Sequence, residues 1–79
     1  MTLRENIRAA AYYIVNEHHC SPSALQRKIG INYLTTYSIL DILERMEIIT
    51  PFDGQRSERK VLINSIEELE DKLDIIFLY

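Results

Sequence analysis

The feature that most limits the fold of this chain is a short break, Gly30-Ile31-Asn32, between two segments of helical periodicity. Before the break, Ser21-Pro22 is a helix start signal, because serine favours the N-cap and proline the first helical position. It predicts a short helix over about 22–29. After the break, Asn32 can cap a helix over about 33–46. The apolar spacing of that helix predicts a buried stripe of Thr36, Ile39, Leu40 and Leu43.

Capping boxes predict two further helices, one on either side of this pair. Thr2 with Glu5 opens a helix over about 3–18. Its expected apolar face is Leu3, Ile7, Ala10, Ala11, Ile14 and Val15. Ser65 with Glu68 opens a helix from about residue 66. The apolar face of that last helix is Ile66, Leu69, Leu73 and Ile76.

The hydrophobic period changes after Met46. Residues 48–52 and 60–63 are short β-prone runs, and the polar segment 53–58 between them carries a turn signal. A helix, a short helix, a tight turn, a helix and a hairpin follow one another as in a winged helix-turn-helix. We therefore predict an α+β, mainly α fold, with three helices and a two-stranded wing over residues 1–64. Residues 65–79 add an acidic and apolar C-terminal helix, a candidate oligomerisation element.

Length, charge and cysteine count indicate how many domains the chain forms and in which compartment it works. A chain of 79 residues makes one domain with a modest core. The single cysteine, Cys20, excludes an internal disulfide, so we expect a reducing, cytoplasmic setting and an inert or surface thiol. No apolar run approaches the roughly 20 residues that cross a bilayer, so we expect no membrane partner. Residues 1–63 carry eight Lys/Arg against seven Asp/Glu, whereas residues 64–79 carry one against five.

The sequence shows no pattern of catalytic residues. No nucleophile stands in an evident relation to a base, and no metal-ligand spacing is visible. The adjacent His18 and His19 would point about 100° apart on a helix, so they are poorly placed to share an ion. We expect a protein that is not an enzyme and that needs neither a cofactor nor a metal.

Several residues at fixed offsets resemble a known family. They are Leu25-Gln26-Arg27-Lys28, Pro51-Phe52-Asp53-Gly54, and Arg59 with Val61-Leu62. Over residues 23–63 the chain resembles the C-terminal, DNA-binding gamma domain of FtsK/SpoIIIE-type DNA translocases. The resemblance implies a winged helix that binds double-stranded DNA, reads a short G-rich sequence and touches a tyrosine recombinase. The Gly-rich phosphate loop of the translocase motor is not present in this sequence.

The base-reading stretch departs from that family. Where the family carries Asn-Arg-Ala-Ala-Arg after the tyrosine of its third helix, this chain has Leu34-Thr35-Thr36-Tyr37-Ser38 after Tyr33. Arginine forks onto guanine O6 and N7, and two such arginines are replaced here, which predicts altered or weakened base readout. The candidate DNA-binding residues are Arg27, Lys28, Tyr33, Thr35, Ser38, Arg56, Arg59 and Lys60.

A protein-interaction or dimerisation module that no longer reads DNA is the alternative. Leu34 and Tyr37 should face outward on the third helix, where they could meet thymine methyl groups or a protein. A protein is slightly preferred for Leu34, and Tyr37 stays open. The wholly apolar end 75–79 exceeds what one helix face buries, which favours a homodimer or a larger protein partner. The candidate interface residues are Leu34, Tyr37, Ile75, Phe77, Leu78 and Tyr79.

Overall fold

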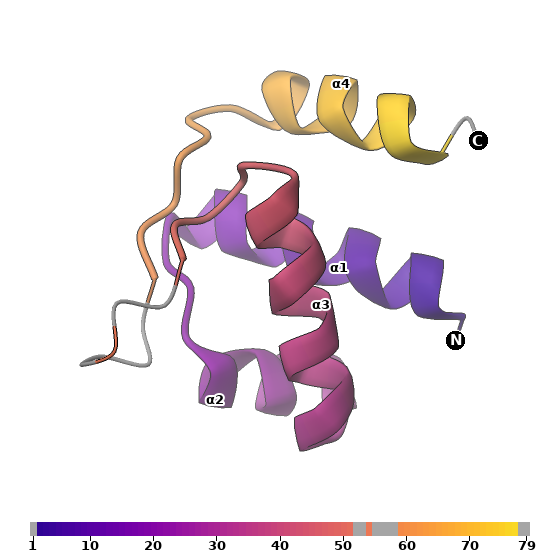
Figure 1. The fold of residues 1–79 in the computed structure, drawn as a ribbon, viewed down its shortest axis with the longest axis vertical. Coiled ribbons are helices and arrows are strands. Elements are labelled where there is room, and N and C mark those ends of the chain that lie inside the picture. Colours follow the sequence, from indigo (N-terminus) through magenta and orange to yellow (C-terminus); the bar gives the residue numbers. More distant parts are fainter. Residues whose placement is uncertain (1, 52–53, 55–58, 78–79) are drawn as a thin grey trace.

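Helices arranged around one core make up most of the chain. The computed structural model describes residues 2–51, 54 and 59–77, with side chains up to residue 74. Its elements are α1 (Leu3–Glu17), α2 (Pro22–Leu25), the π-helix η1 (Gln26–Gly30), α3 (Tyr33–Arg45) and α4 (Ile66–Phe77). In Figure 1, α2 lies beside the N-terminal end of α3, α1 crosses behind α3, and α4 lies at the opposite end of the molecule, next to α1.

Helix α1 begins and packs as the sequence predicts, with one exception. The Thr2 hydroxyl accepts a hydrogen bond from the Glu5 N–H at 3.1 Å, which confirms the first cap. The predicted face is buried from Ile7 to Val15, but Leu3 is 52% exposed. Leu3 lies at the first turn of α1, which extends past the side of α3 in Figure 1, so that α3 does not cover it.

The predicted helix 22–29 is split in two. Its first four residues form α2, and the rest belong to the π-helix η1, which runs one residue further, to Gly30, and whose hydrogen bonds span five residues instead of four. Gly30 ends η1 with φ +74°, a left-handed conformation that glycine adopts without strain. Ser21 occupies the predicted N-cap position, although its side chain makes no capping hydrogen bond.

Helix α3 shows the capping and the buried stripe that the sequence predicts. The Asn32 side-chain oxygen accepts from the Thr35 N–H at 2.7 Å. Thr36 is fully buried together with the predicted apolar residues of the stripe, and its hydroxyl donates to the Asn32 carbonyl at 2.8 Å. The buried hydroxyl therefore has a partner, which avoids the cost of an unsatisfied polar group.

The predicted two-stranded hairpin is not formed as strands in the described part of residues 48–63. Ile49 and Val61 make a single antiparallel bridge. The Thr50 N–H donates to the Lys60 carbonyl at 3.0 Å, and the Leu62 N–H donates to the Ile48 carbonyl at 2.8 Å. The two segments therefore run side by side, but a regular ladder is missing.

Two diverted N–H groups explain the missing ladder. An antiparallel hydrogen-bonded pair exchanges two bonds. Here the Lys60 N–H donates instead to the Thr50 hydroxyl at 3.0 Å, and the Ile48 N–H donates back to the Leu43 carbonyl at the end of α3, also at 3.0 Å. Each pair thus keeps only one bond. The expected polar loop 53–58 lies, apart from Gly54, outside the described residues.

Helix α4 is packed against the rest of the chain. Leu69 and Leu73 are fully buried in the same core as α1 and α3. The Tyr12 hydroxyl donates to a Glu70 carboxylate oxygen at 2.8 Å, and the Lys72 ammonium donates to the Met46 carbonyl at 3.1 Å. Two apolar side chains and two polar contacts thus fasten α4 to α1 and to the end of α3.

The interface predicted for the chain end stays a prediction. The side chains of Ile75 and Phe77, and all of Leu78 and Tyr79, lie outside the described residues. Within the described part of the chain, no helix has the length and apolar character needed to cross a membrane.

The packing of α4 predicts that Leu73→Ala destabilises the fold. Removing a fully buried leucine should lower the free energy of unfolding by about 2–5 kcal/mol, enough to unfold much of so small a domain. Asp71→Ala, on the exposed side of the same helix, should change it by less than about 0.5 kcal/mol. Denaturant titrations followed by circular dichroism compare the two variants. Equal stabilities would show that α4 does not contribute to the core.

Candidate functional site

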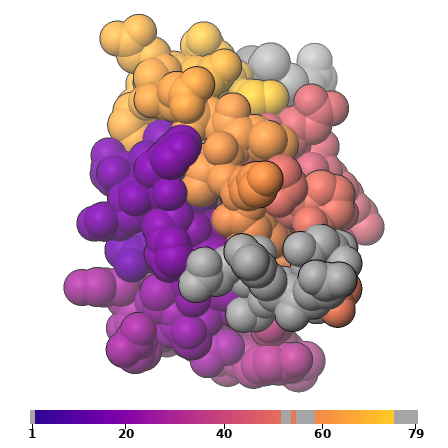
Figure 2. All heavy atoms as spheres, turned by 90° about the vertical axis from the view of Figure 1, so that its left-hand side faces the viewer, coloured from indigo at the N-terminus to yellow at the C-terminus, as the bar shows by residue number. Residues whose placement is uncertain are grey.

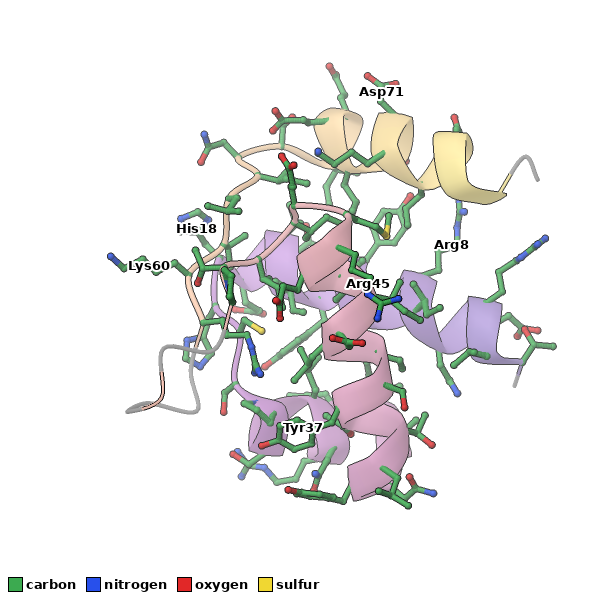
Figure 3. The ribbon with its side chains drawn as sticks, viewed as in Figure 1. Arg8, His18, Tyr37, Arg45, Lys60 and Asp71 are labelled. Atoms are coloured by element: carbon green, nitrogen blue, oxygen red, sulfur yellow. The ribbon has the colours of Figure 1, made fainter. Side chains whose placement is uncertain are left out.

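One face of α3 is open to solvent along the whole helix. Leu34, Ser38, Asp41 and Arg45 are all exposed and follow one another at helical spacing, opposite the buried stripe. We name these four residues the α3 stripe. Leu34, in the first turn, is 76% exposed. Figure 3 shows Arg45 on the side of α3 that is turned away from α1.

The far part of the α3 stripe is an ion pair. The Arg45 guanidinium lies 3.2 Å from the Asp41 carboxylate, four residues earlier. Both side chains are well exposed, so the pair contributes little to stability. Asp41 and Arg45 were not singled out from the sequence. Their spacing of seven and eleven residues from Leu34 places them on its face and could have identified them.

An aromatic pair supports the first turns of α3. The rings of Tyr33 and Tyr37 lie with their centroids 4.7 Å apart, at 46° to one another. Tyr33 is 63% exposed, whereas Tyr37 is half-buried and packs against the core. The guanidinium carbon of Arg59 lies 5.9 Å from the centroid of the Tyr37 ring, within the range of a cation–π contact. Tyr37 thus faces outward less than the sequence suggests.

A groove runs between α3 and the segment that contains Arg59. Its volume is about 370 Å³. The residues that line it are Leu34, Tyr37, Ser38, Asp41, Glu44 and Arg59. Two carboxylates and one guanidinium therefore border an otherwise neutral surface. This groove brings together four candidate residues from the sequence, Leu34, Tyr37 and Ser38 of the third helix and Arg59 of the return segment.

Arg59 is held in place by a buried cysteine. The backbone N–H of Arg59 donates to the backbone carbonyl of Cys20 at 3.1 Å, and the two residues form an antiparallel bridge. Cys20 is fully buried, not at the surface, and burial raises the pKa of its thiol to about 11, although the Arg59 charge opposes that shift. The thiol is neutral at neutral pH, so Cys20 is a structural residue and not a nucleophile.

The predicted phosphate-binding cations surround α3 on separate elements. Arg27 and Lys28 are exposed on η1, where they line a hollow of about 340 Å³ together with Tyr13 and Ala24. Lys60 is exposed on the return segment and points away from the helices in Figure 3. Arg56 lies outside the described residues. The packing of α1 beside η1 places Tyr13 at this hollow.

The remaining predicted DNA-binding residues differ in their exposure. Ser38 is exposed, as base contact requires, and Thr35 is half-buried. The N–H of Thr35 is already used in the Asn32 cap, but its hydroxyl makes no part of that cap. Of the two positions where the related family carries arginine, Ser38 is therefore the better placed to reach a ligand.

The acidic residues of α4 lie far from η1. Its exposed carboxylates belong to Glu67, Glu68, Glu70, Asp71 and Asp74. Figures 1 and 2 show α4 and α2 at opposite ends of the molecule, whose longest extent is 32 Å. At physiological salt, charges more than about 8 Å apart are largely screened. The acidity of the tail therefore leaves the positive potential around Arg27 and Lys28 largely intact.

Comparison with known proteins gives one match. A family model described as the Ftsk gamma domain matches residues 4–64, from the first turn of α1 to the residue before the cap of α4. No curated protein and no solved structure matches the chain.

The raised pKa of Cys20 predicts a loss of stability at alkaline pH. The unfolded thiol ionises near its ordinary pKa of 9.0, whereas the folded one holds its proton to about 11. The buried, protonated thiol therefore contributes about 2–3 kcal/mol to the free energy of unfolding. This contribution is complete below pH 9 and is lost as the pH rises to 11. Guanidinium titrations at pH 8 and pH 11 in reductant measure it. Between pH 8 and pH 11, the free energy of unfolding of Cys20→Ala should fall by about 2–3 kcal/mol less than that of the unchanged protein. An identical fall in both proteins would contradict the raised pKa of Cys20.

Proposed function

The chain belongs to the Ftsk gamma domain family, and we propose that it binds double-stranded DNA as a winged-helix module with α3 in the major groove. The observation that carries the proposal is the exposed stripe that starts in the first turn of α3, directly after a capped turn. In helix-turn-helix proteins the N-terminal residues of the second helix contact base edges while the first helix crosses the backbone. Here α3 is the helix that contacts base edges, and α2 with η1 crosses the backbone.

The segments around the Ile49–Val61 bridge take the place of the wing. They follow α3 directly, run antiparallel, and carry the exposed Lys60. Arg59 lies between this wing and α3, where its contact with Tyr37 fixes the distance between the two elements. A wing of this kind rides along the phosphate backbone, so Lys60 and Arg56 are its proposed phosphate contacts.

Affinity in this proposal comes mainly from phosphates. Arg27 and Lys28 on η1 and Lys60 on the wing are cations on both sides of α3. Phosphate contacts fix the register and orientation of a protein on the duplex, but they carry no sequence information. The binding should therefore be sensitive to salt and tolerant of sequence.

Base readout is proposed to be altered and weak toward G-rich DNA. The α3 stripe offers a leucine, a serine hydroxyl and an arginine that is paired with Asp41. Thr35, at the other position of a family arginine, is half-buried. A guanine edge presents two acceptors, and arginine is the side chain that best satisfies both. Neither Ser38 nor Thr35 can replace that fork.

A protein-interaction module is the second candidate. The 76% exposure of Leu34 and the carboxylates of Asp41 and Glu44 in the same groove favour it, because acidic groups repel phosphates. Under this hypothesis α3 binds a protein partner, and residues 65–79 contribute to self-association. Absence of DNA binding at low salt would select this candidate.

Salt dependence tests the phosphate contacts. We expect Lys28→Gln to reduce the slope of log K against log salt by about 0.9, which is the effect of losing one phosphate contact on B-DNA. Arg8→Gln is the matched control, because Arg8 is an exposed cation on α1, near Tyr12 and α4, and should leave the slope unchanged. Fluorescence anisotropy of a labelled duplex from about 50 to 200 mM salt measures both slopes. Equal slopes for the two variants would place Lys28 outside the interface.

Restoring the family residues tests the altered readout. The triple variant Leu34→Asn, Thr35→Arg, Ser38→Arg should gain a preference for a G-rich over a scrambled duplex, at about 1–3 kcal/mol for each bidentate pair formed. Asn16→Arg with Asn64→Arg adds the same charge at exposed positions away from α3 and should raise affinity for both duplexes alike. A strong preference of the unchanged protein for the G-rich duplex would contradict weakened readout.

A further inference from the structure

Building on the DNA-binding role just proposed, we propose that Leu34 reads thymine, by packing its side chain against the C5-methyl group in the major groove. The site is a single residue of the α3 stripe, and the ligand is a base that carries an apolar edge. The assignment replaces the G-rich target of the family with a target that contains thymine.

The exposure and the chemistry of Leu34 carry the first step. Leu34 is 76% exposed in the first turn of α3, where a helix in the major groove meets base edges. Its side chain has no donor or acceptor. Among the groups that base pairs present in the major groove, the thymine methyl is the apolar one, and the others donate or accept hydrogen bonds. Leucine placed against those polar groups would remove their water without replacing its hydrogen bonds.

The rest of the α3 stripe disfavours guanine. Ser38, one turn after Leu34, can donate or accept and so tolerates either base of an A·T pair. The Asp41 carboxylate, 3.2 Å from Arg45, occupies the guanidinium that could otherwise fork onto guanine. The paired Arg45 therefore removes the side chain that best recognises guanine, whereas Ser38 tolerates either base of an A·T pair.

The surroundings of Leu34 favour DNA over a protein partner. Tyr37 is half-buried against the core and Arg59, and Tyr33 rests on Tyr37. These rings hold the first turns of α3 in position. Tyr33 is 63% exposed but lies outside the α3 stripe, whose exposed apolar side chain is Leu34, beside a serine and an ion pair. A single apolar side chain of this kind suits one methyl group better than a protein interface, which needs a larger apolar centre.

Replacing thymine by uracil tests the assignment, because uracil differs from thymine only in lacking the C5-methyl group. The probes are a labelled mixed-sequence duplex containing thymine and the same duplex with uracil at every thymine position. Uracil keeps the pairing with adenine. Anisotropy titrations at low salt should show about fourfold weaker binding to the uracil duplex for each methyl contacted, the effect of one buried methylene-sized group.

Two leucine variants locate the contact. Leu34→Ala should bind the thymine and uracil duplexes equally. Leu3→Ala removes a leucine that is 52% exposed on α1, and it should keep the preference of the unchanged protein. Circular dichroism confirms that both variants are folded.

Each other result overturns the assignment in a distinct way. Equal binding of the two duplexes by the unchanged protein would refute thymine reading while leaving DNA binding in place. A thymine preference that survives Leu34→Ala would assign the reading to another residue. If the folded protein binds neither duplex at low salt, both the thymine contact and the DNA-binding function fail, and α3 is then a surface for a protein.

Discussion

The burial of Leu69 and Leu73 of α4 in the common core, beside α1, is the interaction on which the rest of this molecule depends. A chain of 79 residues with one cysteine has no disulfide to close its core. The last helix closes it instead, and the Tyr12–Glu70 and Lys72–Met46 hydrogen bonds fix its position. Helix α4 packs beside α1, and the Leu34–Arg45 face of α3 stays exposed.

The helical part of the fold could be predicted from local patterns, because it depends on caps and spacing. The Asn32 cap and the buried Thr36 follow from residues within one turn of each other, and the structure has both. The π-helix after Leu25 could not be predicted, since its register depends on how Gln26–Gly30 packs and not on a pattern. The irregular pairing of the segments around Ile49 and Val61 could not be predicted either, because the Thr50 hydroxyl and the Leu43 carbonyl accept N–H groups that a regular hairpin would pair.

The candidate site was only partly predictable. Exposure of Leu34 follows from helical spacing, whereas Tyr37 packs against the core and lies near Arg59, a residue far away in the sequence. The backbone bridge between Cys20 and Arg59 links the α1–α2 connection to the segment after residue 58. No local sequence pattern predicts this contact. The structure thereby makes Arg59 a residue that positions α3, in addition to its proposed place near a phosphate. The sequence shows the acidic tail and the cations Arg27, Lys28 and Lys60, and the structure adds that α4 lies at the opposite end of the molecule from α2.

We propose that the α3 stripe and the cations beside it form the surface that meets DNA. Amide chemical-shift mapping of the ¹⁵N-labelled protein, titrated with a short duplex at low salt, tests this most directly. The account predicts that the shifted amides cluster at residues 27–28, 33–38 and 59–60, while those of α4 stay in place. Shifts concentrated in α1 and α4, with α3 unaffected, would contradict it.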